Sequence, residues 1–249
     1  MNDLSVGNVV SRSFGIYAKN FVPFTLLALL MQVPVILYTM HLLSGGLQAF
    51  VEGQMIFIFV TSFGSAILSM VATAAITYGV VEELRGNHAP MSRCISVGLS
   101  RLLPVLGTAL LVGLVVALGF VLLIVPGVIL MCMFWLAIPS VVIEGNGGAD
   151  ALTRSKQLTD GYKSKIFGIL FVFGLIGGIA QQVMEAVMDV SSATTPAEAM
   201  DLLRTVMIFA FLFDVIVSSL TAVANAVVYS DIRAIKEGVN TDELASVFD

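Results

Sequence analysis

Long runs of apolar residues dominate the chain, and the polar residues collect in the shorter segments between them. A bilayer whose hydrocarbon core is about 30 Å thick is crossed by roughly 20 helical residues. Five runs reach that length: Phe21–Leu43, Met55–Val81, Leu102–Ile143, Ile166–Val187 and Thr205–Tyr229. The pattern therefore predicts helices that span a membrane.

The third of these runs is about twice as long as one span requires. Pro126 and Gly127 lie near its middle, and this pair interrupts a helix because proline lacks a backbone donor and glycine is conformationally free. We therefore predict two spans here, with the break at Pro126-Gly127, and six spans in all. The expected fold class is an all-α integral membrane protein whose six transmembrane helices form three hairpins.

A polar stretch precedes each predicted hairpin: Val6–Asn20, Met91–Arg101 and Ala149–Lys163. The apolar face of the first comprises Val10, Phe14, Tyr17 and Phe21, and that of the second comprises Ile95, Leu99 and Leu102. Basic amphipathic helices of this kind suit the headgroup layer of a membrane. We therefore expect a short amphipathic interfacial helix before each hairpin.

The repetition of helix and hairpin predicts three pseudo-repeat units, at about residues 6–81, 91–143 and 149–232. Together they are expected to form one six-span transmembrane domain, residues 1–232, followed by a short cytoplasmic tail, residues 233–249.

Composition supports the membrane interpretation. Apolar residues make up 58% of the chain and charged residues only 12%, the mean hydropathy is +0.99 and the net charge is −5. Soluble domains contain about 25% charged residues, and a nucleic-acid binder needs a basic patch. These values exclude a soluble enzyme and predict membrane lipids, another membrane protein or a second copy of the chain as partners, with no nucleic acid.

The basic residues predict the orientation, because Lys and Arg favour cytoplasmic segments. With six spans and a cytoplasmic N-terminus, only Arg204 lies on the outer side. The other basic residues lie on the inner side: Arg12, Lys19, Arg85, Arg93, Arg101, Arg154, Lys156, Lys163, Lys165, Arg233 and Lys236. Both termini are therefore expected in the cytoplasm.

Residues 123–165 carry an "IVPG" break, an aromatic-rich span that ends in "P-x-x-x-x-E-G", and the pattern "A-L-x-R-S-x-x-L-x-x-G". This segment resembles the membrane domain found beside some bacterial glycerophosphoryl diester phosphodiesterases, and the related YciC-like inner-membrane proteins. The motif positions are Pro126, Gly127, Glu144, Gly145, Arg154 and Ser155. The resemblance implies a bacterial inner-membrane protein with an accessory or lipid-related role. It implies no enzymatic activity, since the phosphodiesterase barrel is not among the predicted elements.

Asp214 lies ten residues into the last run, at a depth of about 15 Å. Ser218, Thr221 and Asn225 follow it on one helical stripe, and no Lys or Arg lies inside any predicted span. A carboxyl group at this depth is costly unless it is paired, protonated or hydrated. Two interpretations remain open: a proton or cation site facing a polar cavity, and a protonated Asp214 that hydrogen-bonds to neighbouring spans.

The second span carries its own hydroxyl stripe, comprising Ser62, Ser65, Ser69, Thr73 and Thr77. Such stripes let helices pack closely, and they are also compatible with a dimer interface or a solute path. The candidate intramembrane polar site consists of Asp214, Ser218, Thr221, Asn225, Ser65 and Ser69. Gln32 also lies within a span.

The best cytoplasmic candidate begins at Glu144, where a glycine-rich segment is followed by Arg154, Lys156, Lys163 and Lys165. Bases next to a membrane attract anionic lipid headgroups at about 1 kcal/mol each, although positive-inside anchoring accounts for them equally well. No motif for a metal, a cofactor or a catalytic nucleophile is present. The sequence favours a non-enzymatic accessory protein that binds lipid or a partner membrane protein; the alternative is a small proton- or cation-coupled transporter or channel that uses Asp214.

Overall fold

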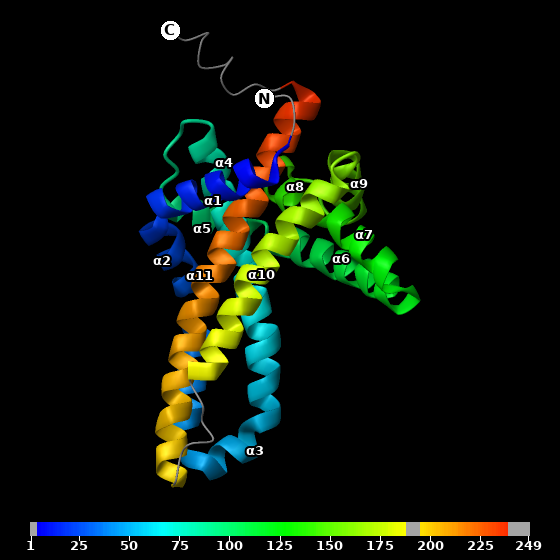
Figure 1. Cartoon of the computed structure of the whole chain (residues 1–249). Coiled ribbons are helices and arrows are strands. Elements are labelled where there is room, and N and C mark those ends of the chain that lie inside the picture. Colours follow the sequence, from blue (N-terminus) through cyan, green and yellow to red (C-terminus); the bar gives the residue numbers. More distant parts are fainter. Residues whose placement is uncertain (1–3, 188–194, 239–249) are drawn as a thin grey trace.

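The computed structural model describes residues 4–187 and 195–238, which are almost entirely helical and contain no strand (Figure 1). The predicted first unit contains α1 (Val6–Lys19), α2 (Phe21–Ser44), α3 (Gly46–Phe59), the π-helical turn η1 (Val60–Gly64) and α4 (Ser65–Leu84). The predicted second unit contains α5 (Met91–Ser100), α6 (Leu102–Leu122), α7 (Ile124–Phe134) and α8 (Ala137–Glu144). The predicted third unit contains α9 (Ala149–Thr159), α10 (Lys163–Val187) and α11 (Pro196–Glu237). The predicted all-helical class is confirmed.

Among the described residues, five helical stretches are long and apolar enough to cross a membrane: Phe21–Ser44, Val51–Leu84, Leu102–Leu122, Ile124–Glu144 and Ala197–Glu237. The bent pair α9 and α10, whose axes meet at 100°, makes a sixth stretch if it is counted as one span. The fold is therefore compatible with a multi-pass membrane protein of five to six spans.

Short helices occupy the three polar stretches that precede the long ones. Figure 1 shows α1 lying across α11 at the end of the molecule where the N-terminus lies, which we call the α1 end, whereas α3 lies at the opposite end, the α3 end. The buried residues of α1 are Val9, Ser13 and Tyr17, and those of α5 are Cys94 and Gly98.

Phe14 and Leu99 belong to the predicted apolar faces, and they are 41% and 54% exposed on the protein surface. α1 packs on α11 and α5 packs on α4 through other residues, so the contact of the predicted apolar faces with a headgroup layer stays a prediction. A Cβ atom at Gly98 would lie only 2.8 Å from the carbonyl oxygen of Val71. The axis of α5 therefore approaches α4 at a position where a side chain does not fit.

The break in the long third run lies at Leu123 rather than at Pro126-Gly127. Leu123 is extended, with φ −166° and ψ 157°, and α7 begins at the next residue. Pro126 then falls in the first turn of α7, where the missing N–H group has no helical partner to lose. Gly127 serves close packing instead, because a Cβ atom there would lie 2.5 Å from the ring of Phe120 in α6.

The last helix is longer than the apolar run that predicted it. Thr195 caps its N-terminus in a reciprocal capping box with Glu198, and Gly238 ends it in the left-handed conformation. These signals lie outside the apolar segment Thr205–Tyr229, which is why hydropathy alone missed them. With 42 residues, α11 is about 63 Å long, and it continues through the expected boundary between residues 232 and 233.

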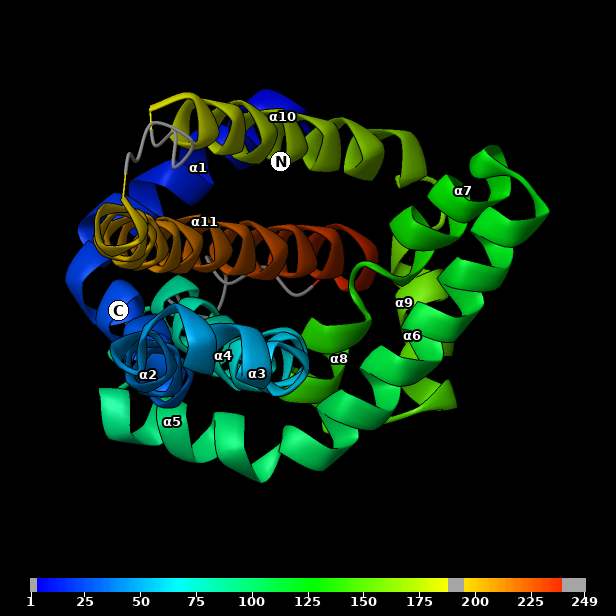
Figure 2. The same cartoon turned by 90° about the horizontal axis from the view of Figure 1, so that it is seen from below.

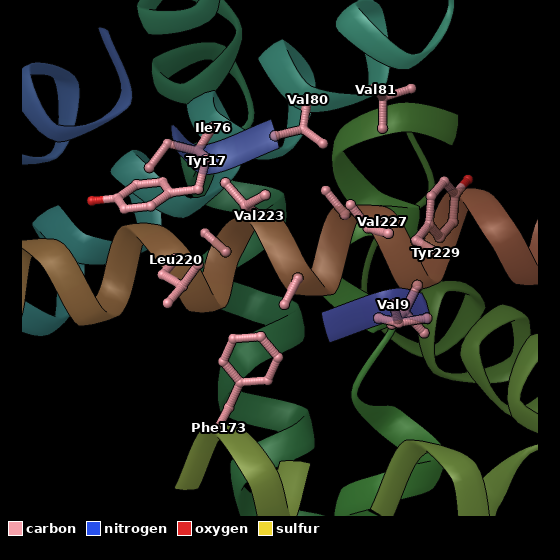
Figure 3. Close-up of a cluster of buried hydrophobic side chains, with 14 of the residues drawn as sticks. Val9, Tyr17, Ile76, Val80, Val81, Phe173, Leu220, Val223, Val227 and Tyr229 are labelled. Atoms are coloured by element: carbon pink, nitrogen blue, oxygen red, sulfur yellow. The ribbon is translucent and has the colours of Figure 1, made fainter. Parts of the chain in front are cut away.

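The core of the molecule surrounds the half of α11 that lies nearer the α1 end. Figure 2 shows α11 between α10 on one side and the pair α2 and α4 on the other, and Figure 3 shows side chains of α1, α4 and α10 directed toward it. The α11 residues that are at most 3% exposed include Ala222, Val223, Ala224, Ala226, Val227, Val228, Tyr229 and Ile232. This half of α11 is therefore packed by protein on every side.

The predicted orientation has a direct test by cysteine labelling. Ser5 and Thr195 are exposed and lie at opposite ends of the molecule, whereas the native Cys94 and Cys132 are buried. In intact spheroplasts, we expect a membrane-impermeant maleimide to label Thr195→Cys at once and Ser5→Cys only after lysis. Labelling of Ser5→Cys before lysis would contradict a cytoplasmic N-terminus.

Candidate functional site

Three helices enclose a small polar pocket inside the bundle. Its volume is about 10 Å³, which is the space of a single water molecule. The lining residues come from α2, α4 and α11, and they are Ala28, Gln32, Ser69, Ala72, Thr73, Ile76, Ser218 and Ser219. The pocket therefore joins the two hydroxyl stripes and adds Gln32, which had not been assigned to the candidate site. We call it the Gln32 pocket.

The polar atoms of this pocket are mainly hydrogen-bond acceptors. Ser69 Oγ donates to the Ala66 carbonyl at 2.9 Å, and Ser218 Oγ and Ser219 Oγ both donate to the Val215 carbonyl, at 3.3 and 2.5 Å. Their hydroxyl protons are thus used within their own helices, while the oxygen lone pairs remain. Gln32 is 4% exposed, and its Oε1 atom has no hydrogen-bond partner.

Burial increases along both hydroxyl stripes toward the α1 end. On α11, Asp214 is exposed, Ser218 and Thr221 are half-buried, and Asn225 is 8% exposed. Asn225 Nδ2 donates to the Trp135 carbonyl at 3.2 Å, between α7 and α8. This stripe therefore begins on the surface of the bundle and ends inside it.

The stripe on α4 has the same gradient. Ser62 is exposed, Ser65 and Ser69 are half-buried, and Thr77 is completely buried with no partner for its Oγ1 atom. Ser65 Oγ donates to the Thr61 carbonyl, one turn earlier, at the π-helical turn η1. A polar surface on two adjacent helices thus leads from the outside of the bundle to the Gln32 pocket.

Asp214 lies outside this pocket. Its side chain is exposed and does not line the pocket. Both interpretations of Asp214 therefore stay predictions. Asp214 lies one helical turn before Ser218, on the same face of α11.

A second polar cluster holds α8, α9 and α11 together at the α1 end. Arg154 Nε donates to both carboxylate oxygens of Glu144, at 2.8 and 2.9 Å, and a further guanidinium nitrogen of Arg154 donates to Glu237. Tyr229 Oη donates to Glu144 at 2.7 Å, and Arg233 pairs with Glu237 at 2.8 Å. We call these five residues the Arg154 network.

This network changes the interpretation of the sequence motif. The hydrogen bond to Glu144 raises the pKa of Arg154 above its usual range, and the guanidinium is occupied by two carboxylates rather than open to a headgroup. Ser155 donates to the Met133 carbonyl at 2.8 Å, and Gly145, with φ +80°, faces the Arg101 guanidinium. Glu144, Gly145, Arg154 and Ser155 therefore form a structural junction.

The lysines that follow Arg154 have a different environment. Lys156 is exposed, and Lys163 pairs with Asp160 at 3.5 Å. The ammonium groups of Lys165 and Lys236 lie 5.9 and 5.8 Å from the centre of the Tyr162 ring. We call Tyr162, Lys163, Lys165 and Lys236 the Tyr162 cluster.

Sequence reasoning had not singled out Tyr162, Tyr229 or Glu237. An aromatic residue between bases at a membrane boundary is a usable signal for Tyr162, whereas the partners of Tyr229 and Glu237 are distant in sequence. Within the described residues, no group of three or more His, Cys, Asp or Glu side chains is placed to hold a metal ion.

Comparison of the chain with protein families, with curated proteins and with solved structures gave no match.

Proposed function

We propose that this chain is a non-enzymatic accessory protein of the bacterial inner membrane, in the class suggested by its resemblance to the glycerophosphodiesterase-associated and YciC-like membrane domains. In this proposal it has six spans in three hairpins, each after an interfacial helix, and both termini lie in the cytoplasm. Its function is to bind anionic lipid at the cytoplasmic surface. The Tyr162 cluster is the observation that carries this proposal.

The position of the cluster suits a lipid headgroup and its acyl chains at once. Lys163 begins α10, and Phe167 and Phe171 follow it at intervals of one turn, with exposed fractions of 45% and 56%. Lysine ammonium groups at the surface attract lipid phosphates, tyrosine favours the interface, and the exposed rings provide apolar surface immediately below. Cations and apolar surface are therefore adjacent on one helix.

The alternative, a small proton- or cation-coupled transporter, receives less support from the geometry. Asp214 lies outside the pocket, and the polar stripe on α11 ends at Asn225. Beyond that point a solute would have to pass the packed half of α11, where Val227 and Val228 are fully buried. The arrangement favours binding over passage.

The proposal is tested by measuring lipid binding to the full chain. In a detergent solution of the purified protein, we expect phosphatidylglycerol to bind and raise the melting temperature more than phosphatidylcholine does. The double variant Lys165→Ala/Lys236→Ala removes two ammonium groups at about 1 kcal/mol each, so its affinity for phosphatidylglycerol should fall roughly 30-fold.

Arg93→Ala is the matched control, because Arg93 is an exposed base on α5 in the second unit. It should keep the affinity of the unmodified protein. Equal binding of both lipids, or an equal loss in Arg93→Ala, would contradict a specific site. Proton or cation flux in liposomes that disappears in Asp214→Asn would favour the transporter instead.

A further inference from the structure

The Gln32 pocket has no part in lipid binding at the Tyr162 cluster, yet it contains a buried polar atom without a partner. An unsatisfied acceptor inside a protein keeps the full cost of its lost hydration, and in a membrane no bulk water relieves it. Gln32 Oε1 is such an atom. A polar group in this position therefore indicates an occupant.

We propose that the pocket binds one monovalent cation of about the size of sodium. Its ligands are the side-chain oxygens of Gln32, Ser69, Thr73, Ser218 and Ser219, which line one small space. Hard cations prefer oxygen ligands. The lining contains no His, Cys, Asp or Glu side chain, so it lacks the ligands that transition metals prefer.

The hydrogen bonds of the lining residues favour a cation over a water molecule. The hydroxyl protons of Ser69, Ser218 and Ser219 are donated to carbonyl groups of their own helices. The lone pairs of Ser69 and Ser218 and that of Gln32 Oε1 remain, which gives three acceptor oxygens. A water molecule has two protons and satisfies two of them, whereas a cation attracts all of them together.

Asp214 provides the counter-charge. It lies one turn before Ser218 on the same face of α11, where side chains four residues apart are neighbours. Its carboxylate has no basic partner among the described residues, and Arg204, the nearest base along α11, is ten residues away, or about 15 Å. A cation in the pocket and the Asp214 carboxylate therefore each lower the cost of placing the other charge in the membrane.

The gradient of burial along α4 and α11 allows the cation to enter the pocket but not to cross the bundle. Ser69, Thr73 and Ser218 are half-buried, so the pocket is not sealed off from the outside of the bundle. Toward the α1 end the stripes close at Thr77 and Asn225. The cation is bound and exchanges from one side only.

The experiment compares the melting temperature of the full chain, in nanodiscs of neutral lipid, in NaCl, KCl and choline chloride at equal ionic strength. We expect a saturable increase with NaCl that choline chloride does not produce. Asp214→Asn should raise the half-saturating concentration of sodium roughly tenfold. Gln32→Met should remove the dependence of the melting temperature on sodium.

Gln182→Met is the matched control, because Gln182 is an exposed amide on α10, and it should respond to sodium as the unmodified protein does. If Gln32→Met fails to fold, Gln32→Glu provides a second test: it adds a negative ligand and should bind sodium more tightly. Equal melting temperatures in all three salts, or an unchanged sodium response in Gln32→Glu, would overturn the proposal and leave a water molecule as the occupant.

Discussion

Arg154→Met is expected to lower the free energy of unfolding by about 2–3 kcal/mol. The substitution removes the guanidinium that joins Glu144 to Glu237, and it leaves the Glu144 carboxylate, 13% exposed, without a cation. Removing one partner of a buried pair costs more than the pair contributes, because the remaining charge is left uncompensated. Glu237 keeps its pair with Arg233 and Glu144 keeps the hydrogen bond from Tyr229, so the loss stays below the 3–5 kcal/mol typical of a fully buried pair.

A double-mutant cycle separates this effect from lost packing. The double variant Glu144→Gln/Arg154→Met removes both charges of the pair, so neither charge is left without its partner. Its loss of unfolding free energy should therefore be smaller than the sum of the losses in the two single variants. Arg85→Ala is the control, because Arg85 is 44% exposed and pairs only with Glu82 three residues away, and it should change stability by less than about 0.5 kcal/mol. Additive losses in reversible unfolding would show that the Arg154 network is not a coupled unit.

Gly98→Ala is the second substitution with a large expected effect, a destabilisation of about 1–3 kcal/mol. The new Cβ atom would lie 2.8 Å from the Val71 carbonyl oxygen and 3.1 Å from the Ala75 Cβ atom. A backbone oxygen in the middle of α4 cannot rotate away as a side chain does. The substitution therefore forces α5 away from α4, and unfolding of the full chain in detergent should report the loss.

Gly15→Ala gives the opposite expectation in the corresponding helix of the first unit. No atom lies within 4 Å of a Cβ built at Gly15, and alanine favours a helix over glycine by up to about 1 kcal/mol. Gly15→Ala should thus be neutral or stabilising. Equal effects of the two substitutions would mean that α5 does not pack on α4 as described.

The sequence predicted the long helices because each coincides with a long apolar run. The first run was predicted as Phe21–Leu43, and α2 is Phe21–Ser44. The break in the third run was misplaced because Pro126 was treated as an interior breaker. The sequence contains no comparable signal at Leu123, where the chain turns.

The candidate site was predicted only in part. Helical periodicity shows which residues of one helix share a face, and it placed Asp214, Ser218, Thr221 and Asn225 on one stripe. It does not show which face meets which helix, so it could not bring Gln32 of α2 together with Ser69 and Ser218. The Arg154 network joins residues as far apart as Glu144 and Tyr229, and neither residue carries a local signal for the other.

The central position of α11 has a consequence for the order in which the protein is made. The packed half of α11 contains Val223 and Val227, which are completely buried, and Val9 of α1 packs over it. Ribosomes add roughly 5–20 residues per second, so the first helix waits roughly 10–40 s for the partner that buries it. The core around the packed half of α11 therefore forms only after nearly the whole chain has been made.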